Sequence, residues 1–287
     1  MGSTLNSNGC SKFRVKANSR GQVVNDFSPF SEAWAGKDPF EEIKKIEGVV
    51  YRHVLNRSTT RFEFCGQVYY IKVHTGSSLR EILKNLVCLK LPVLGAGNEY
   101  RAILKLHELN VNTMDVVAFG ERGYSPFKRK SFIITKELTP TMDLRAYCLN
   151  WRLQPPSFEH KRAIIATVAD MLRRMHSGGV NHRDCYLVHF LVDLTVKDPL
   201  KPRLFLIDLH RAQIRRTTPK RWRNKDLVEL YYSSKRVGFS LKDYFYFLMK
   251  YKRSDSLRDV LMEERHLISG LERKSERIAK RSAKKHL

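Results

Sequence analysis

No stretch of this sequence stays apolar for the about 18 residues that a membrane-spanning helix requires, so we expect no integral membrane protein. Residues 1–11 lack the basic start and the apolar segment of a secretory signal, and Asn6 stands where N-myristoylation requires Ser or Thr. The five cysteines are odd in number, widely spaced and free of any Cys-x-x-Cys pair. These absences predict a reduced chain that stays in the cytoplasm.

Acidic side chains are scarce relative to basic ones. The chain has 53 Lys and Arg against 29 Asp and Glu, which gives a formal net charge of +24 at pH 7. Residues 201–287 alone carry 24 basic and 10 acidic residues, or +14 of that total. An excess of this size predicts a polyanionic partner, such as a nucleic acid, an anionic membrane surface or a phosphorylated substrate.

The first half of the chain is predicted to be a tail followed by a β-rich region. Residues 1–27 are rich in Ser, Asn and Gly without apolar periodicity, which predicts a flexible tail. Asp38, Pro39 and Glu41 are a helix-start signal. Beyond them, alternating β-branched and aromatic residues predict an antiparallel meander. The expected strands are residues 49–55, 61–65, 68–73, 116–119 and 131–136, and the expected helices are residues 78–89 and 98–109.

After residue 138 the pattern becomes helical, interrupted by one short apolar strand at 204–207. Helices are expected over residues 142–150, 158–176, 224–237, 241–250 and 257–278. We therefore predict an α+β chain with a small antiparallel β-rich lobe before a larger helical lobe. Its parts are a tail over 1–27, an N-lobe over 28–138, a helical C-lobe over 139–256 and a basic amphipathic C-terminal helix over 257–287.

Four separated motifs carry chemistry. Residues 181–184 read Asn-His-Arg-Asp, and Asp208 follows the expected strand 204–207. Upstream, Lys72 lies in the third expected strand and Glu99 begins the helix behind it. In this order they resemble the protein-kinase fold. There, one Asp accepts the proton of the acceptor hydroxyl, another holds Mg²⁺, and a Lys–Glu pair anchors the nucleotide phosphates.

Each motif alone has an ordinary explanation. An isolated His-Arg-Asp is usually accidental, and Lys72 alone would be a solvated strand lysine. Glu99 would be a surface charge on a helix, and Asp208 would cap a turn. Because all four occur in the order of a kinase, the combination favours a two-lobed, protein-kinase-like fold.

Longer stretches point to a narrower family. They resemble the lipopolysaccharide core heptose kinases of Gram-negative bacteria, from about Phe27 to the C-terminus. The stretches are residues 37–40 (Lys-Asp-Pro-Phe), 91–96 (Leu-Pro-Val-Leu-Gly-Ala), 181–186 (Asn-His-Arg-Asp-Cys-Tyr), 189–191 (His-Phe-Leu), 207–213 (Ile-Asp-Leu-His-Arg-Ala-Gln) and 221–227 (Arg-Trp-Arg-Asn-Lys-Asp-Leu). The resemblance implies an ATP- and Mg²⁺-dependent kinase that phosphorylates the first heptose of the lipid A-linked inner core.

Carried over position by position, the resemblance implies that Asp184 is the catalytic base and that Arg183 positions its loop. Asp226 resembles the buried aspartate that braces this loop, although a charge near a helix N-terminus is an alternative explanation. Backbone groups of residues 137 and 138 would contact adenine. The implied cofactor site comprises Lys72, Glu99, Glu137, Leu138, His189 and Asp208, and Asp208 and His189 are its candidate metal ligands.

Two features depart from the general kinase pattern. His189 occupies the position at which kinases usually have a metal-binding Asn, and imidazole is a poor ligand for Mg²⁺. His189 therefore either binds phosphate or ligates the metal. In addition, no glycine lies between Val50 and Gly66, so residues 56–61 would cover the phosphates without a glycine-rich loop.

The basic segment after Asp208 is the expected acceptor site, with an ordinary solvated loop as the alternative. There we expect Lys220, Arg221, Trp222 and Arg223 to bind the anionic core oligosaccharide. Residues 272–287 carry seven basic and two acidic residues, which suits an anionic inner-membrane surface. The expected location is therefore peripheral, at the cytoplasmic face of that membrane. The resemblance also allows an acyl carrier protein as a partner.

Two other functions stay open at this point. One is an atypical kinase associated with RNA or ribosomes, although no nucleic-acid-binding motif is visible and we expect no nucleic acid partner. The other is a catalytically inactive kinase-like platform, motivated by His189 and the missing glycines. Turnover of ATP would separate the platform from both kinases, and the acceptor would separate the two kinases.

Overall fold

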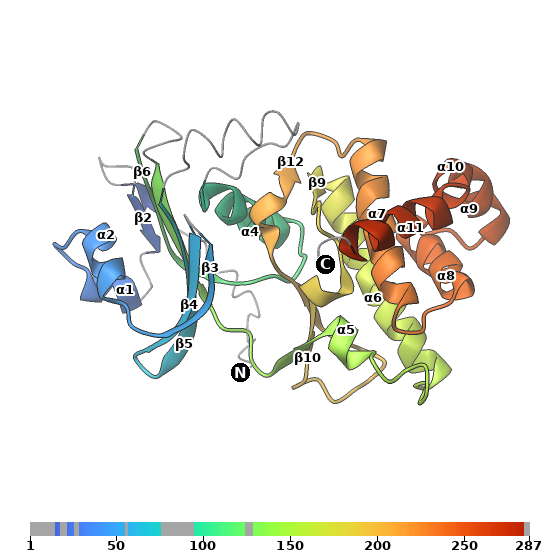
Figure 1. The fold of residues 1–287 in the computed structure, drawn as a ribbon, viewed down its shortest axis with the longest axis horizontal. Coiled ribbons are helices and arrows are strands. Elements are labelled where there is room, and N and C mark those ends of the chain that lie inside the picture. Colours follow the sequence, from blue (N-terminus) through green and yellow to red (C-terminus); the bar gives the residue numbers. More distant parts are fainter. Residues whose placement is uncertain are drawn as a thin grey trace, which may run out of the picture. The chain divides into compact units, whose positions relative to one another are not determined.

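The computed structural model describes residues 15–17, 22–25, 29–54, 57–75, 95–123 and 129–283 (Figure 1). The tertiary contacts divide the chain into two compact units. The first comprises residues 1–97 and 116–136, and the second comprises residues 98–115 and 137–287. No helix among the described residues combines the length and apolar character that crossing a bilayer requires.

The first unit is built on a seven-stranded antiparallel sheet in the order β1-β2-β6-β7-β5-β4-β3 (Figure 1). The predicted meander is confirmed as the β3-β4-β5 portion of this sheet. The strands are β1 (Val15–Ala17), β2 (Gln22–Asn25), β3 (Val49–Val54), β4 (Arg57–Phe64), β5 (Gln67–Thr75), β6 (Val116–Arg122) and β7 (Lys130–Lys136).

Two short helices, α1 (Pro29–Ala33) and α2 (Pro39–Glu42), supply aromatic side chains to the core of this unit. Asp38 caps α2 by accepting from the N–H of Phe40, and Pro39 occupies the first turn, as the sequence predicts. Asp38 also forms an ion pair with Arg122 of β6 at 2.8 Å. The cluster includes Phe30, Trp34, Phe40, Ile43, Phe62, Tyr69, Ile71 and Phe132.

Two expectations for this unit are wrong. Residues 15–17 and 22–25, predicted to belong to a flexible tail, form β1 and β2, because β2 pairs with β6 along its backbone. These strands are too short to show a period of two in the sequence. Residues 57–60, which the predicted strand boundaries leave between two strands, belong to β4, and this strand pairs with β3. The helix predicted at 78–89 lies outside the described residues.

The second unit is mainly helical. Its long helices α6, α7 and α8 and the C-terminal α11 are drawn in yellow-green to red in Figure 1. The helices are α4 (Gly97–Glu108), α5 (Leu144–Tyr147), α6 (Phe158–Ser177), α7 (Lys220–Lys235), α8 (Leu241–Lys252), α9 (Leu257–Glu263), α10 (Arg265–Ile268) and α11 (Leu271–Ala283). The short strands are β8 (Thr141–Asp143), β9 (Val180–Asn181), β10 (Phe190–Asp193), β11 (Leu204–Leu206) and β12 (Gln213–Ile214).

Residues 98–115, which the predicted boundary assigned to the first lobe, cluster with the second unit. The side-chain amide of Asn98 donates to the carbonyls of His210 and Ala212, at 2.9 and 2.7 Å. Thr113 Oγ1 donates to the carbonyl of Leu206 at 2.6 Å. These polar contacts join residues about a hundred positions apart, which sequence periodicity does not reveal.

The helical boundaries differ from the prediction in three places. The helix expected at 142–150 is β8 followed by α5, because Asp143 caps α5 by accepting from the N–H of Ala146. The helix expected at 224–237 begins four residues earlier, at Lys220. The single helix expected at 257–278 is divided into α9, α10 and α11.

Candidate active site

The segment that leads into β9 passes close to the backbone that follows β12, at a point that requires glycine. Gly179 has φ +82°, and its carbonyl accepts from the N–H of Arg215 at 2.9 Å. A Cβ atom built on Gly179 would lie 1.9 Å from the carbonyl oxygen of Arg215. Only glycine therefore allows the chain to pass this point and enter the Asn-His-Arg-Asp loop.

Asp226 of α7 braces this loop through hydrogen bonds to its backbone. Its carboxylate accepts from the backbone N–H groups of His182 and Arg183, at 2.7 and 2.8 Å, and its side chain is completely buried. His176 of α6 lies 3.2 Å away on the same carboxylate. Burial alone would raise the pKa of Asp226, but the hydrogen bond from His176 and the neighbouring imidazoles hold it below its ordinary value.

Two further side chains of α7 continue this bracing. Glu229 accepts from the N–H of Cys185 at 3.1 Å, and Ser233 Oγ accepts from the N–H of Leu187 at 3.1 Å. Together with Asp226 they lie three and four residues apart, so all three face one side of the helix. One face of α7 thus satisfies most of the backbone donors of residues 182–187 and fixes the loop.

Burial raises the pKa of Glu229 to about 7, against the opposing effect of the nearby Lys225 ammonium. Lys225 contacts both Glu229 and the carbonyl of Arg183. Glu229 also accepts from the hydroxyl of Tyr186 at 3.3 Å. The carboxyl group therefore titrates near neutral pH while it holds the loop.

Asp184, the predicted catalytic base, is paired with Arg211. Nη1 of Arg211 lies 2.9 and 2.8 Å from the two carboxylate oxygens of Asp184. Arg211 lies in the short 3₁₀ turn Leu209–Arg211 that follows Asp208, so the two halves of the motif are joined by this contact. The guanidinium orients the carboxylate, which a proton acceptor requires.

Asp208 lies two residues after the short strand β11 and is flanked by imidazoles. His189 Nε2 lies 3.4 Å from one carboxylate oxygen, and His210 Nδ1 contacts the other. Asp208 has φ 63°, in the left-handed region. Such a conformation is costly for a residue with a side chain and is typical of functional sites.

The position of the His189 ring is set by the loop. Nδ1 of His189 lies 2.6 Å from the carbonyl of Asp184, so it donates its proton there and directs Nε2 toward Asp208. The ring stacks on His182 with a centroid separation of 5.4 Å. Burial, together with the nearby His189, lowers the pKa of His182, so His182 is neutral and donates from Nε2 to the carbonyl of Ile207.

The donor set around Asp208 fits a metal bound together with a nucleotide. Within the described residues, no three His, Cys, Asp or Glu side chains converge on a point where they could hold a metal by themselves. Mg²⁺ is commonly held by one or two carboxylates and by phosphate oxygens and water. Asp208 offers such a carboxylate, and Nε2 of His189 faces it.

The other predicted cofactor residues are spread over both units. Lys72 lies in β5, in register with Thr59 of β4 and Ile133 of β7, and belongs to the first unit. Glu99 is buried in α4 of the second unit, so the Lys72–Glu99 pair remains a prediction. Residues 137 and 138 follow β7, and the carbonyl of Leu138 accepts from Thr141 Oγ1 at 2.6 Å.

The predicted acceptor residues separate into two groups. Lys220, Arg221 and Trp222 lie in the first turn of α7, where Lys220 and Arg221 are exposed. Arg223 points elsewhere: its guanidinium pairs with Glu264 at 2.5 and 2.8 Å, and its side chain is only 15% exposed. Because the charge of Arg223 is already neutralised by Glu264 inside the helical unit, we do not include Arg223 in the proposed acceptor site.

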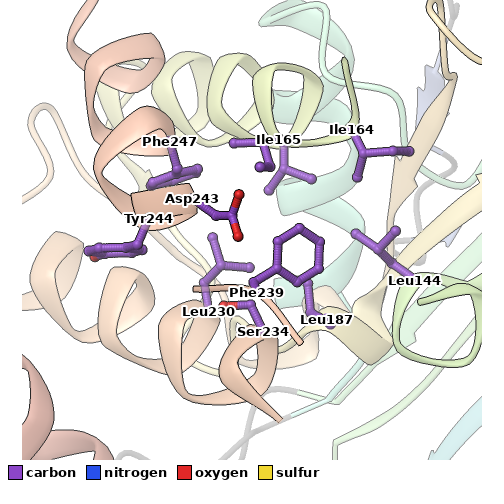
Figure 2. Close-up of a pocket in the computed structure, with 11 residues that line it drawn as sticks. Leu144, Ile164, Ile165, Leu187, Leu230, Ser234, Phe239, Asp243, Tyr244 and Phe247 are labelled. Carbon is purple, nitrogen blue, oxygen red and sulfur yellow. The ribbon is translucent and has the colours of Figure 1, made fainter. Parts of the chain in front are cut away.

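A second feature of this unit is an apolar pocket between α5, α6, α7 and α8 (Figure 2). The only ionisable side chains among its lining residues are Asp243 and Tyr244, and Asp243 is paired with Lys161 at 2.6 Å. The lining residues are Leu144, Ile164, Ile165, Val168, Leu187, Leu230, Ser234, Phe239, Asp243, Tyr244 and Phe247. Leu187 also belongs to the loop that Ser233 fixes, so pocket and loop share a wall.

The sequence alone did not identify Glu229, Ser233, His210 or Arg211 as parts of the site. The spacing of Asp226, Glu229 and Ser233 is a signal that could have been found, because it places three polar groups on one face of a helix that is otherwise buried. The contact between Arg211 and Asp184 has no comparable signal.

A loop that presents an aspartate, braced by a buried aspartate and followed by a second aspartate at a strand end, defines a kinase-like phosphotransferase. Comparison with known proteins narrows this class. The model of the lipopolysaccharide kinase (Kdo/WaaP) family matches residues 41–251. The chain belongs to this family.

Curated relatives are similar over nearly the whole chain. The lipopolysaccharide core heptose(I) kinase WaaP of Escherichia coli is 46% identical over 260 residues, covering 90% of this chain and 98% of the relative. The WaaP of Pseudomonas aeruginosa is 48% identical over 256 residues, covering 88% and 94%. A solved structure of WaaP in complex with acyl carrier protein superposes with a TM-score of 0.78 at 43% identity, covering 89% of this chain and 98% of that one. The predicted kinase-like α+β fold and family are therefore confirmed.

Proposed function

We propose that this chain transfers the γ-phosphate of ATP to the first heptose of the lipopolysaccharide inner core. The observation that carries the proposal is the braced loop that presents Asp184 beside Asp208, in a chain whose relatives are named as heptose(I) kinases. Neither alternative, an RNA-associated kinase or an inactive platform, has support from these relatives.

Each residue of the loop and its surroundings has a separate role in the proposed phosphate transfer. Asp184 accepts the proton of the attacking heptose hydroxyl, and Arg211 holds the carboxylate in position. Asp208, with His189 beside it, would hold Mg²⁺, which neutralises charge on the phosphates when bound. Arg183, whose N–H and carbonyl are both held by α7, fixes the direction of the loop.

For the nucleotide we retain the predicted assignments. Lys72 would hold the α- and β-phosphates with Glu99 as its partner. Backbone groups of Glu137 and Leu138 would contact adenine. The carbonyl of Leu138 already accepts from Thr141, which leaves its N–H as the more available group.

The direct test incubates the purified full chain with labelled ATP, Mg²⁺ and lipopolysaccharide core from which phosphate has been removed. We expect label in the core and release of ADP in equal amounts. A core that lacks the first heptose is the matched control and should stay unlabelled. Labelling of RNA instead would favour the RNA-associated kinase, and no turnover with any acceptor would favour the inactive platform.

We further propose that the basic helix α11 holds the enzyme at an anionic membrane surface. In α11, Leu271 and Ser275 are buried, and most of the charged side chains are exposed. Glu272 is already paired with Lys235 at 2.7 Å, so the positive charge dominates. Replacing Arg273, Arg277, Lys280 and Arg281 by Gln should abolish flotation with anionic vesicles and leave activity on detergent-dispersed core unchanged. Unchanged flotation would exclude this role.

The apolar pocket supports a proposal about a protein partner. One relative of known structure was solved in complex with acyl carrier protein. Such a carrier presents an acyl chain, and the pocket of Figure 2 offers the apolar surroundings that an acyl chain requires. We expect Ile165→Trp, which fills the pocket, to weaken binding of acylated carrier more than binding of carrier without an acyl chain. Equal effects on both carriers would exclude the pocket.

A further inference from the structure

The N-terminus of α7 is unusual in its charge. Pro219 precedes the helix and makes no side-chain cap hydrogen bond, and the first turn contains no acidic residue. Instead it begins with Lys220 and Arg221. Because the helix dipole makes this end positive, cations are unfavourable there and an anion is favourable. A 16-residue helix that starts in this way places a positive potential next to the catalytic loop.

Three guanidinium groups surround the ring of Trp222 in the same turn. The Cζ atoms of Arg221, Arg183 and Arg215 lie 4.9, 5.1 and 6.0 Å from the ring centroid. Arg183 lies in the braced loop, Arg215 follows β12 and Arg221 belongs to α7, so three segments bring one charge each to the ring. Burial, and then repulsion by Arg211 and Arg215, lowers the pKa of Arg183.

Two donors inside this cluster lack an acceptor. The indole Nε1 of Trp222 and the Nε of Arg183 are buried and have no hydrogen-bond partner among the residues that the structure describes. A buried donor without a partner costs about 1–3 kcal/mol. Like charges around one ring and unpaired donors are unfavourable for folding, so they indicate a site that a ligand completes.

We infer that Trp222 and the guanidinium groups of Arg183, Arg215 and Arg221 form an oxyanion subsite for a carboxylate or phosphate group of the acceptor. This inference rests on the proposed function and names the chemical group that this part of the site recognises. Arg215 is held in place by Asn181 and Gln213, at 2.7 and 2.6 Å, which makes the subsite preorganised.

The subsite gives Trp222 a role other than direct binding of the core oligosaccharide. Its ring is a platform that spaces the guanidinium groups, and the groups carry the recognition. Arg183 also joins the subsite to the catalytic loop, since its N–H is held by the same Asp226 that holds the N–H of His182. An anion bound here therefore places the neighbouring sugar of the acceptor beside Asp184.

The test compares acceptors with and without anionic groups. Arg221→Gln should raise KM for core that lacks only the phosphate of the first heptose about tenfold and leave KM for ATP unchanged, because it removes a charged hydrogen bond to the acceptor. If the anion is a carboxylate, the unchanged enzyme should already have a raised KM for carboxyl-reduced core. Arg221→Gln should then raise the KM for this acceptor no further. If it is a phosphate, core from which the other phosphates have also been removed should behave in that way. The exposed Arg216→Gln is the charge-matched control and should change neither constant.

The inference is overturned if Arg221→Gln raises KM equally for all three acceptors, if it leaves every KM unchanged, or if it affects ATP alone. A second measurement does not depend on the proposed activity. Inorganic phosphate, titrated at constant ionic strength without nucleotide, should change tryptophan fluorescence in a saturable way. The change should disappear in Trp222→Phe and weaken about tenfold in Arg221→Gln. An identical response in all three proteins would exclude the subsite, whereas absence of core phosphorylation by the unchanged enzyme would instead exclude the proposed function.

Discussion

One nitrogen of Arg211 contacts both carboxylate oxygens of Asp184, at 2.9 and 2.8 Å. Arg211 follows Asp208 by three residues, so the segment that begins at Asp208 also sets the orientation of the proposed base. A carboxylate held in this way keeps a fixed direction toward an incoming hydroxyl. The relationship makes Arg211 a positioning residue, and it leads to the first prediction.

Arg211→Ala should lower kcat by about 100-fold and leave KM for ATP within about twofold. The reason is that a misoriented carboxylate stabilises the transition state less but does not affect nucleotide binding. Added guanidinium chloride at millimolar concentration should restore part of kcat. The control, Arg216→Ala, removes an exposed charge in the same segment and should show neither effect. Loss of activity without rescue would mean that Arg211 serves only the fold.

The brace formed by Asp226 should be important for stability. Asp226→Ala leaves the buried N–H groups of His182 and Arg183 without an acceptor, so we expect the free energy of unfolding to fall by about 3 kcal/mol. Urea unfolding followed by circular dichroism measures it. The exposed Asp255→Ala should change stability by less than about 0.5 kcal/mol. Equal effects of the two substitutions would contradict the bracing role.

Glu229 should make stability depend on pH near neutrality. Its pKa is raised to about 7 in the folded chain, above its ordinary value of 4.5, so the folded state binds the proton more tightly. The stabilisation is complete below the unfolded pKa and is lost as pH rises through the folded one. Because a tenfold change in proton affinity is about 1.4 kcal/mol, the loss from this group is roughly 3 kcal/mol.

The measurement compares unfolding free energies of the unchanged protein and Glu229→Gln from about pH 5 to about pH 8. The unchanged protein should lose stability relative to the variant as pH rises, since Gln cannot ionise. Parallel curves would show that Glu229 is ionised throughout and that burial does not control it.

His189 should decide the metal preference. Its Nδ1 donates to the carbonyl of Asp184, which directs Nε2 toward Asp208. If Nε2 ligates the metal, the unchanged enzyme should use Mn²⁺ better than Mg²⁺, and His189→Asn should lose that preference because amide oxygen suits Mg²⁺. Metal titrations of activity in both proteins measure the preference. Identical profiles would exclude ligation and leave a phosphate contact as the role of His189.

Much of the site could be predicted from the sequence because it depends on local motifs. Asp184, Asp208 and Asp226 lie in short segments with characteristic neighbours, and strands such as β5 show their alternation directly. The predicted start of α7 is too late because three of its first four residues, Lys220, Arg221 and Arg223, are charged and do not resemble a buried helix. Local propensity therefore gave the wrong boundary.

Contacts between distant segments could not be predicted. The association of residues 98–115 with the second unit depends on the amide of Asn98 and the hydroxyl of Thr113, each bonded to a backbone carbonyl. The pairing of Arg223 with Glu264 likewise joins residues 41 positions apart. In each case one polar partner belongs to a residue type that is common on protein surfaces. Only the folded structure shows which distant residue it contacts.

The central claim is that Asp184 takes the proton of the heptose hydroxyl, and a single comparison tests it most directly. Phosphate transfer to dephosphorylated core and binding of ATP are measured in the same preparations of the unchanged enzyme and of Asp184→Asn. We expect kcat to fall by about 10²–10⁴-fold in the variant while its affinity for ATP and its unfolding midpoint stay close to those of the unchanged enzyme. A variant that retains more than about a tenth of the activity would contradict the assignment of Asp184 as the base.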